Sequence, residues 1–151
     1  MRYPNVLLLT AVVLGLAASS CRSATTIAFD HAGLQVRDLD KSISFYRALG
    51  LHKIDDPFKD NTHIWLSLGG DQALHLLAGA LPTDGHRAMD VHLALRVRSI
   101  YGIVTTLNRL NVAYFNNKQV PQAITIRADG VRQIYLQDPD GYWLEINDAA
   151  R

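Results

Sequence analysis

Four side chains of the kinds that bind transition metals stand out in the sequence. They are three imidazoles and one carboxylate: His31, His75, His92 and Glu145. His31 and His92 lie 61 positions apart, and His75 and Glu145 lie 70 positions apart, in two stretches that repeat each other. Neutral imidazole nitrogens with one carboxylate oxygen suit a borderline divalent ion such as Zn, Ni, Fe or Mn. The pattern predicts one divalent metal ion held by these four residues.

His75 also has a plainer interpretation. It lies in the stretch QALHLLAG, which is short, apolar and typical of a strand. Side chains alternate along a strand, so His75 points away from Leu74 and Leu76. Taken alone, such a histidine is more often a structural residue than a ligand. Its place opposite Glu145 in the repeat favours the ligand.

The repeat extends well beyond these residues. At an offset of 61, Leu34 matches Leu95 and Val36 matches Val97. Further along each half the offset becomes 70, and Ile64 then matches Ile134. The change requires nine extra residues in the second half, and the polar stretch NNKQVPQAI is the natural place for them.

Each half predicts the same order of elements. A strand (27–36 and 91–97) is followed by a helix, DLDKSISFYRAL with Asp38 as N-cap or SIYGIVTTLNRL with Ser99 as N-cap. Three short strands close each half, and a DPDG turn joins the last two in the second. The prediction is an α+β fold. Two βαβββ modules, 27–80 and 90–148 within a single domain of 22–151, form a cup-shaped mixed sheet with helices on its outer face.

Strand alternation separates an apolar face, which the helices can cover, from a face that holds all four predicted ligands. On the second face we expect Glu145 to be the catalytic base and four further residues to contact substrate: Trp65, Arg96, Tyr135 and Trp143. Arg132 is an alternative to Arg96 as the anchor of an acidic substrate group. His63 shares the face but is expected at its rim, and His52 and His86 in loops. The alternative is a solvent-exposed face that happens to collect histidines.

The first residues have the pattern of an export signal. One basic residue precedes an uncharged apolar run from Val6 to Ala18, which is too short to span a bilayer comfortably. The sequence ASSC at 18–21 resembles a bacterial lipobox, so residues 1–21 are predicted to be a signal peptide and Cys21 a lipidation site that attaches the protein to the membrane. Simple cleavage and secretion is the alternative. We therefore expect an exported protein, periplasmic or held in the cell envelope.

The composition argues against two further features, a nucleic-acid partner and an intramolecular disulfide. Charges nearly balance, with 15 Lys and Arg against 14 Asp and Glu, and the absence of a basic cluster argues against a nucleic-acid partner. Cys21 is the only cysteine, so an intramolecular disulfide is excluded.

With these residues in place, the chain resembles the vicinal oxygen chelate superfamily, also called the glyoxalase and dioxygenase fold. The resemblance rests on FDHAGLQVRDLDKSISFYRALGL, VHLALRV and VRQIYLQDPDGYWLEI. It implies ligands on the first and last strand of each module, which again are His31, His75, His92 and Glu145. A set of four ligands is most similar to glyoxalase I and the acyl-CoA epimerases. This chain departs from both, because the His75 position is usually Glu in the former and Gln in the latter.

The resemblance implies a metal-dependent glyoxalase-like lyase or isomerase. Its small-molecule substrate would be an α-hydroxycarbonyl or a hemithioacetal, with the metal as Lewis acid for an ene-diolate and Glu145 moving the proton. One alternative is an extradiol-type dioxygenase, which would use His31, His92 and Glu145. The other is an exported protein that binds a small molecule or metal without turnover. A homodimer is expected, and the modules either pair within one chain or swap between two.

Overall fold

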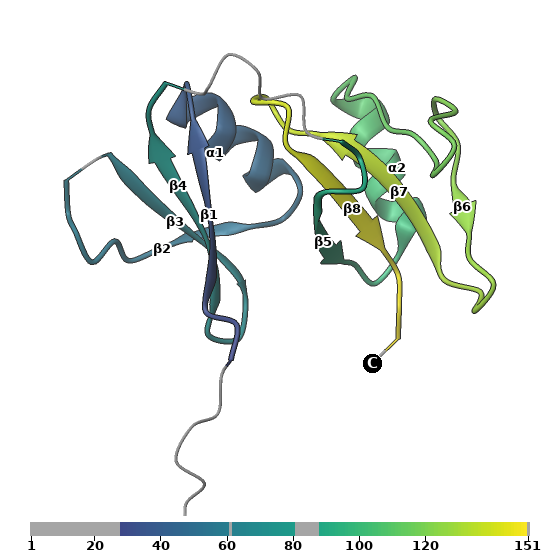
Figure 1. The fold of residues 1–151 in the computed structure, drawn as a ribbon, viewed down its shortest axis with the longest axis horizontal. Coiled ribbons are helices and arrows are strands. Elements are labelled where there is room, and N and C mark those ends of the chain that lie inside the picture. Colours follow the sequence, from purple (N-terminus) through teal and green to yellow (C-terminus); the bar gives the residue numbers. More distant parts are fainter. Residues whose placement is uncertain (1–27, 61, 81–87, 151) are drawn as a thin grey trace, which may run out of the picture.

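The structure, a computed structural model, describes residues 28–60, 62–80 and 88–150. The predicted signal peptide, Cys21 and His86 lie outside these ranges. Within them, two βαβββ modules follow one another, which confirms the predicted fold class. Figure 1 shows the two sheets side by side, with a helix packed on each. None of the helices in the described ranges has the length and apolar character needed to cross a membrane.

The two modules have the same strand order. The first runs β1-β4-β3-β2 and the second β5-β8-β7-β6, and in each the first and last strands of the module pair in parallel. The first module comprises β1 (His31–Val36), α1 (Leu39–Ala48), β2 (His52–Ile54), β3 (His63–Gly69) and β4 (Gln72–Ala78). The second comprises β5 (His92–Arg96), α2 (Ile100–Arg109), β6 (Thr125–Ile126), β7 (Arg132–Gln137) and β8 (Trp143–Asn147).

Both helices begin where their N-caps predict. The Asp38 side chain accepts a hydrogen bond from the Lys41 amide, and the Ser99 side chain accepts one from the Gly102 amide. One expectation was wrong: His52 is not a loop residue but begins β2, where it pairs with Ser67 of β3. This strand has only three residues, all of them exposed, so it is too short to show the alternation of apolar and polar residues that marks a strand.

The predicted apolar face forms the core. Its central residues are fully or almost fully buried under the helices: Val36, Leu66, Leu74, Leu76, Ile134, Leu136, Leu144 and Ile146. Tyr46 of α1 and Leu107 of α2 complete it. Burying each large side chain contributes about 1.5–3 kcal/mol before conformational entropy is subtracted.

The turn between β7 and β8 ties the two modules together. Asp138 accepts a hydrogen bond from the Tyr46 hydroxyl at 2.7 Å, and Asp140 accepts one from the Ser42 hydroxyl at 3.1 Å. The Asp140 carboxylate also accepts from the Arg37 amide. The DPDG segment therefore carries two buried carboxylates that are satisfied by α1 and the end of β1. No strand pairing joins the two sheets in the described ranges.

Candidate metal centre

The four predicted metal ligands lie as two pairs on two sheets. In the first module, the ring centroids of His31 and His75 are 5.8 Å apart. In the second, His92 Nε2 lies 3.4 Å from Glu145 Oε2. We call these pairs the first half-site and the second half-site. Over the part of the chain that the structure describes, no three His, Cys, Asp or Glu side chains are grouped closely enough to hold a metal ion. One chain thus presents two halves and does not unite them.

Strand register explains each pair. In the first module Gly33 of β1 lies opposite His75 of β4, so His31, two residues earlier, projects from the same face. In the second module Ala94 of β5 lies opposite Glu145 of β8, and His92 is again two residues earlier. The half-sites are therefore equivalent positions of the internal repeat, as the sequence predicts.

Glu145 is buried and held at both oxygens. Oε2 accepts a hydrogen bond from the Tyr135 hydroxyl at 2.8 Å, and Oε1 accepts one from the side-chain amide of Asn147 at 2.8 Å. Gln133 in turn donates to the Tyr135 oxygen at 2.8 Å. Burial, together with this bond to Glu145, raises the pKa of Tyr135 to about 12. Tyr135 therefore remains a hydrogen-bond donor to the carboxylate at neutral pH.

The orientation of His92 leaves a nitrogen facing Glu145. His92 Nδ1 lies 2.8 Å from the Met89 carbonyl oxygen, which can only accept, so Nδ1 carries the hydrogen. In the neutral ring Nε2 then has a lone pair, and this lone pair faces Glu145 Oε2. Two acceptors at this separation are stabilised only when a proton or a metal cation lies between them. The second half-site thus has the polarity of a cation site.

The first half-site also leaves nitrogens available. His75 is only 7% exposed, and its Nε2 is buried without a hydrogen-bond partner in the described ranges. Burial, and then the nearby His63 and His31, lower the pKa of His75, which keeps the ring neutral and able to coordinate. His31 Nδ1 is hydrogen-bonded to the Asp30 carboxylate, which orients the ring and frees Nε2.

Aromatic side chains enclose His75. The Trp65 ring stacks on it, with centroids 4.1 Å apart and planes 12° apart, and the Trp65 indole nitrogen is also buried without a partner in the described part of the chain. His63 lies 5.2 Å from His75, and Phe58 covers His63 at 4.5 Å. Trp65 thus forms a wall beside the predicted ligand.

His63 begins β3 on the same face, and its ring is oriented by a carboxylate. Its Nδ1 lies 2.7 Å and 2.8 Å from the two oxygens of Asp60. This hydrogen bond, followed by that from the Thr62 amide, lowers the pKa of Asp60 to about 2. Sequence reasoning missed Asp30, Asp60 and Phe58. The signal for the carboxylates was their position one residue (Asp30) and three residues (Asp60) before a histidine. Phe58 lies in a connection where no periodicity applies.

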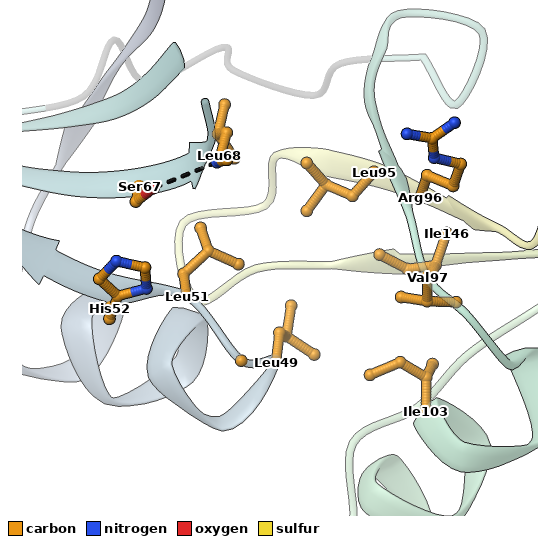
Figure 2. Close-up of a pocket in the computed structure, with 12 residues that line it drawn as sticks. Leu49, Leu51, His52, Ser67, Leu68, Leu95, Arg96, Val97, Ile103 and Ile146 are labelled. Carbon is orange, nitrogen blue, oxygen red and sulfur yellow. Dashed lines mark hydrogen bonds between the residues drawn. The ribbon is translucent and has the colours of Figure 1, made fainter. Parts of the chain in front are cut away.

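The remaining predicted residues are placed as follows. Trp143 lies opposite His92 in the β5–β8 ladder, and its ring centroid is 6.1 Å from that of Phe115. Arg96 lines a cavity between the modules and makes no salt bridge to a described residue (Figure 2). Arg132 forms a salt bridge with Asp148 at 3.0 Å, so its charge is already paired.

The side chains present fit a divalent metal ion. The donors are three imidazoles and one carboxylate, two of the imidazoles have Nδ1 bound by an oxygen, and the third has a buried nitrogen without a partner. Outer hydrogen bonds of this kind orient metal ligands in proteins. The fit requires the two half-sites to come together.

Known proteins share this fold. The family model described as "Glyoxalase/Bleomycin resistance protein/Dioxygenase superfamily" matches residues 28–146. The protein YwbC of Bacillus subtilis (strain 168) is 30% identical over 125 residues, which cover 77% of this chain and 93% of YwbC.

Solved structures agree with this match. A glyoxalase family protein from Bacillus anthracis has a TM-score of 0.65 at 19% identity, covering 84% of this chain and 98% of that one. Lactoylglutathione lyase from Agrobacterium tumefaciens has a TM-score of 0.59 at 18% identity, and the oxidase ChaP-H2 has 0.61 at 20%. Each alignment with these two covers 83% of this chain and 96% of the other. At these identities the structural matches establish the fold, and together with the family model they show that the chain belongs to the Glyoxalase/Bleomycin resistance protein/Dioxygenase superfamily.

Proposed function

We propose that the protein is a metal-dependent lyase or isomerase of glyoxalase type. Its metal site would combine the first half-site of one copy with the second half-site of another. The observation that carries this proposal is the state of the two half-sites. His75 Nε2 is buried without a partner in the described ranges, and His92 Nε2 faces the Glu145 carboxylate. Each half-site thus has donor atoms for a cation, but only two of the four predicted ligands.

The edge strands support assembly between copies. β1 and β5 are the outer strands of their sheets, and they begin with His31 and His92. Exposed strand edges present unpaired N–H and C=O groups that favour pairing with another chain. Placing β1 of one copy beside β5 of another would align equivalent strands of the repeat and bring His31 close to His92. A twofold dimer built this way contains two identical sites.

His31, His75, His92 and Glu145 would hold the ion, which when bound supplies Lewis-acid polarisation of a substrate carbonyl. The residues of the chain transfer the proton and position the carboxylate that carries it. Glu145 removes a proton from the carbon next to that carbonyl and returns it to the neighbouring carbon. Tyr135 and Asn147 hold the carboxylate in place during both transfers, since each donates to one of its oxygens.

The enclosure around His75 selects a small substrate. Trp65 covers one face of the ring, and Phe58 and His63 lie on the same side of the sheet. These apolar ring faces exclude water from the reacting carbon and leave the polar end of the substrate to the metal. A small α-hydroxycarbonyl or hemithioacetal has the required pair of adjacent oxygens.

The test is metal content together with turnover. The purified protein, loaded with Zn, Ni, Fe or Mn and dialysed, is analysed by inductively coupled plasma mass spectrometry. We expect one ion per chain. His75→Ala and His92→Ala should lose it, and the exposed His52→Ala should retain it. Isomerisation of the hemithioacetal of methylglyoxal and glutathione is then followed in wild type and Glu145→Gln. Metal without turnover would favour a binding protein, and absence of metal would overturn the proposal.

We further propose export with lipidation at Cys21, because this cysteine directly follows the uncharged run from Val6 to Ala18. Metabolic labelling with radioactive palmitate in a bacterial host should mark the wild-type chain. Cys21→Ser should be unlabelled and recovered in the soluble envelope fraction. An unlabelled wild-type chain would contradict lipidation.

A further inference from the structure

Two arginines lie beyond Glu145 on the face of the second sheet that carries His92 and Glu145, which we call the site face. Arg96 of β5 pairs with Asn147 of β8 in the strand register, one row along from the pair of Ala94 and Glu145. Residues two apart on a strand project from the same face, about 7 Å from each other. The Arg96 side chain therefore belongs to the site face, at the end of the sheet opposite to His92.

Arg127 belongs to the same end of the site face. Thr125 of β6 pairs with Gln133 of β7, and Gln133 pairs with Asn147 of β8, so these three share the face. The pairing with β7 continues through the backbone amide of Arg127, which places the Arg127 side chain on the same face as Thr125. The electrostatics agree, because the positive charge of Arg127 opposes the rise in the pKa of Tyr135.

Both arginines line a hollow of about 580 Å³ at this end of the site face, and Ala94 and Asn147 line it with them. None of the residues that line the hollow is acidic. Arg127 pairs with Asp129, whereas Arg96 is exposed and makes no salt bridge to a described residue. Of the two guanidinium charges one is thus balanced by a described carboxylate, and the other is left for a ligand.

We propose that the substrate of the metal centre carries a carboxylate group, which Arg96 and Arg127 bind while the reacting oxygens lie at the second half-site. This inference rests on the proposed function and names the class of its substrate. A carboxylate matches the single unbalanced charge and accepts hydrogen bonds from guanidinium groups. The row spacing places it about 7 Å beyond Glu145. Arg132 takes no part, because its guanidinium lies over the Tyr101 ring of helix α2, on the opposite face of the sheet.

The first test is binding to the metal-free, full-length protein. The probes are 5-oxohexanoate, which has a carbonyl oxygen and a carboxylate, and its neutral counterpart 5-oxohexanamide. Wild type should bind 5-oxohexanoate with a Kd of about 1 mM and the amide about tenfold more weakly. In nitrogen-15 NMR spectra, the side-chain Nε–H signals of Arg96 and Arg127 should shift together as the carboxylate is added.

Two variants and a control locate the binding. Arg96→Gln and Arg127→Gln should each weaken 5-oxohexanoate about tenfold and leave 5-oxohexanamide unchanged, because only charged hydrogen bonds are removed. Arg109→Gln is the matched control, since Arg109 is exposed in the last turn of helix α2 and does not line the hollow. It should bind both probes as wild type does.

The second test is turnover by the metal-loaded protein. The hemithioacetals of methylglyoxal with 3-mercaptopropionate and with 3-mercaptopropionamide provide a charged and a neutral substrate. KM should be about tenfold lower for the charged one, and Arg96→Gln should remove this difference with kcat little changed.

Equal binding of the acid and the amide to wild type would overturn the proposal, as would equal losses in Arg96→Gln and Arg109→Gln. Arginine-dependent binding of 4-oxopentyl phosphate that is tighter than that of 5-oxohexanoate would replace the carboxylate by a phosphate. Metal and turnover together with a failed binding test would overturn only the carboxylate assignment. Binding of 5-oxohexanoate by a protein that takes up no metal would support the carboxylate site and overturn only the metal centre.

Discussion

The Tyr46 hydroxyl donates a 2.7 Å hydrogen bond to the Asp138 carboxylate, across a separation of 92 residues. Tyr46 is fully buried in α1 of the first module, and Asp138 is 6% exposed in the β7–β8 turn of the second. The Asp138 carboxylate also accepts hydrogen bonds from the backbone amides of Asp140 and Tyr142. One carboxylate therefore both shapes its turn and holds the neighbouring module. Together with the bonds of Asp140 to Ser42 and to the Arg37 amide, this bond holds the two modules against each other.

Tyr46→Phe should therefore destabilise the protein. The substitution preserves the ring in the core but leaves a buried carboxylate oxygen without its donor, which costs about 1–3 kcal/mol. Urea unfolding followed by circular dichroism measures the loss. Tyr114→Phe is the control, because Tyr114 is buried but its hydroxyl bonds to no described residue, and its effect should be within about 0.5 kcal/mol. Equal losses in the two variants would contradict this role of the bond.

Two glycines should respond to alanine in opposite directions. Gly141 closes the turn with a φ of +83°, a conformation that costs an L-residue about 1–2 kcal/mol, so Gly141→Ala should destabilise. Gly102 lies in helix α2, and a Cβ there would meet only ordinary contacts at 3.8 Å and beyond. Gly102→Ala should stabilise by up to about 1 kcal/mol. Thermal unfolding of the two variants measures whether each change lowers or raises the stability of the protein.

Asp60 should titrate near pH 2 in the folded protein, since its hydrogen bond to His63 lowers the pKa of the carboxyl from the ordinary 3.8. A lowered folded-state pKa means that the stabilisation is present above pH 3.8 and is lost as the pH falls through 2. Carbon-13 NMR of the carboxyl group measures this directly. In His63→Phe the pKa of Asp60 should move back toward 3.8. The pKa of Asp148, which is lowered by Arg132, is the control and should not change. An unchanged Asp60 titration would rule out His63 as the cause.

Tyr135→Phe should weaken metal binding without abolishing it. The change removes a hydrogen bond to the carboxylate of Glu145, and losing such an outer partner typically reduces metal affinity about 10–100-fold. Competition for Zn against a chromophoric chelator gives the dissociation constant. Tyr114→Phe serves again as the control and should match wild type. An affinity equal to that of wild type would place the Tyr135–Glu145 bond outside the metal site.

Mixing two defective proteins should restore metal sites if the half-sites of different copies combine. His75→Ala damages the first half-site and Glu145→Gln the second, so a mixed dimer has one site with both defects and one intact site. After unfolding and refolding together in equal amounts, about one quarter of all sites should be intact. Metal analysis after size-exclusion chromatography counts them. No recovery would contradict the assembly of sites from half-sites of different copies.

Much of the fold and the membership of each half-site followed from the sequence. The caps Asp38 and Ser99, the buried alternation of Leu74 and Leu76, and the placement of His75 on the opposite face are local properties, set by hydrogen bonds and periodicity within a few residues. The repeat then placed His31 beside His75 and His92 beside Glu145, because equivalent strands adopt equivalent registers.

The tertiary structure decided how the two modules sit relative to each other. That arrangement rests on contacts such as Tyr46 with Asp138, between residues far apart in the chain, and periodicity does not encode such contacts. It separates the four expected ligands into two half-sites, leaves β1 and β5 as edges, and creates the cavity beside Arg96. Alternation fixes the face from which a side chain projects, but the packing of modules determines which other side chains that face meets.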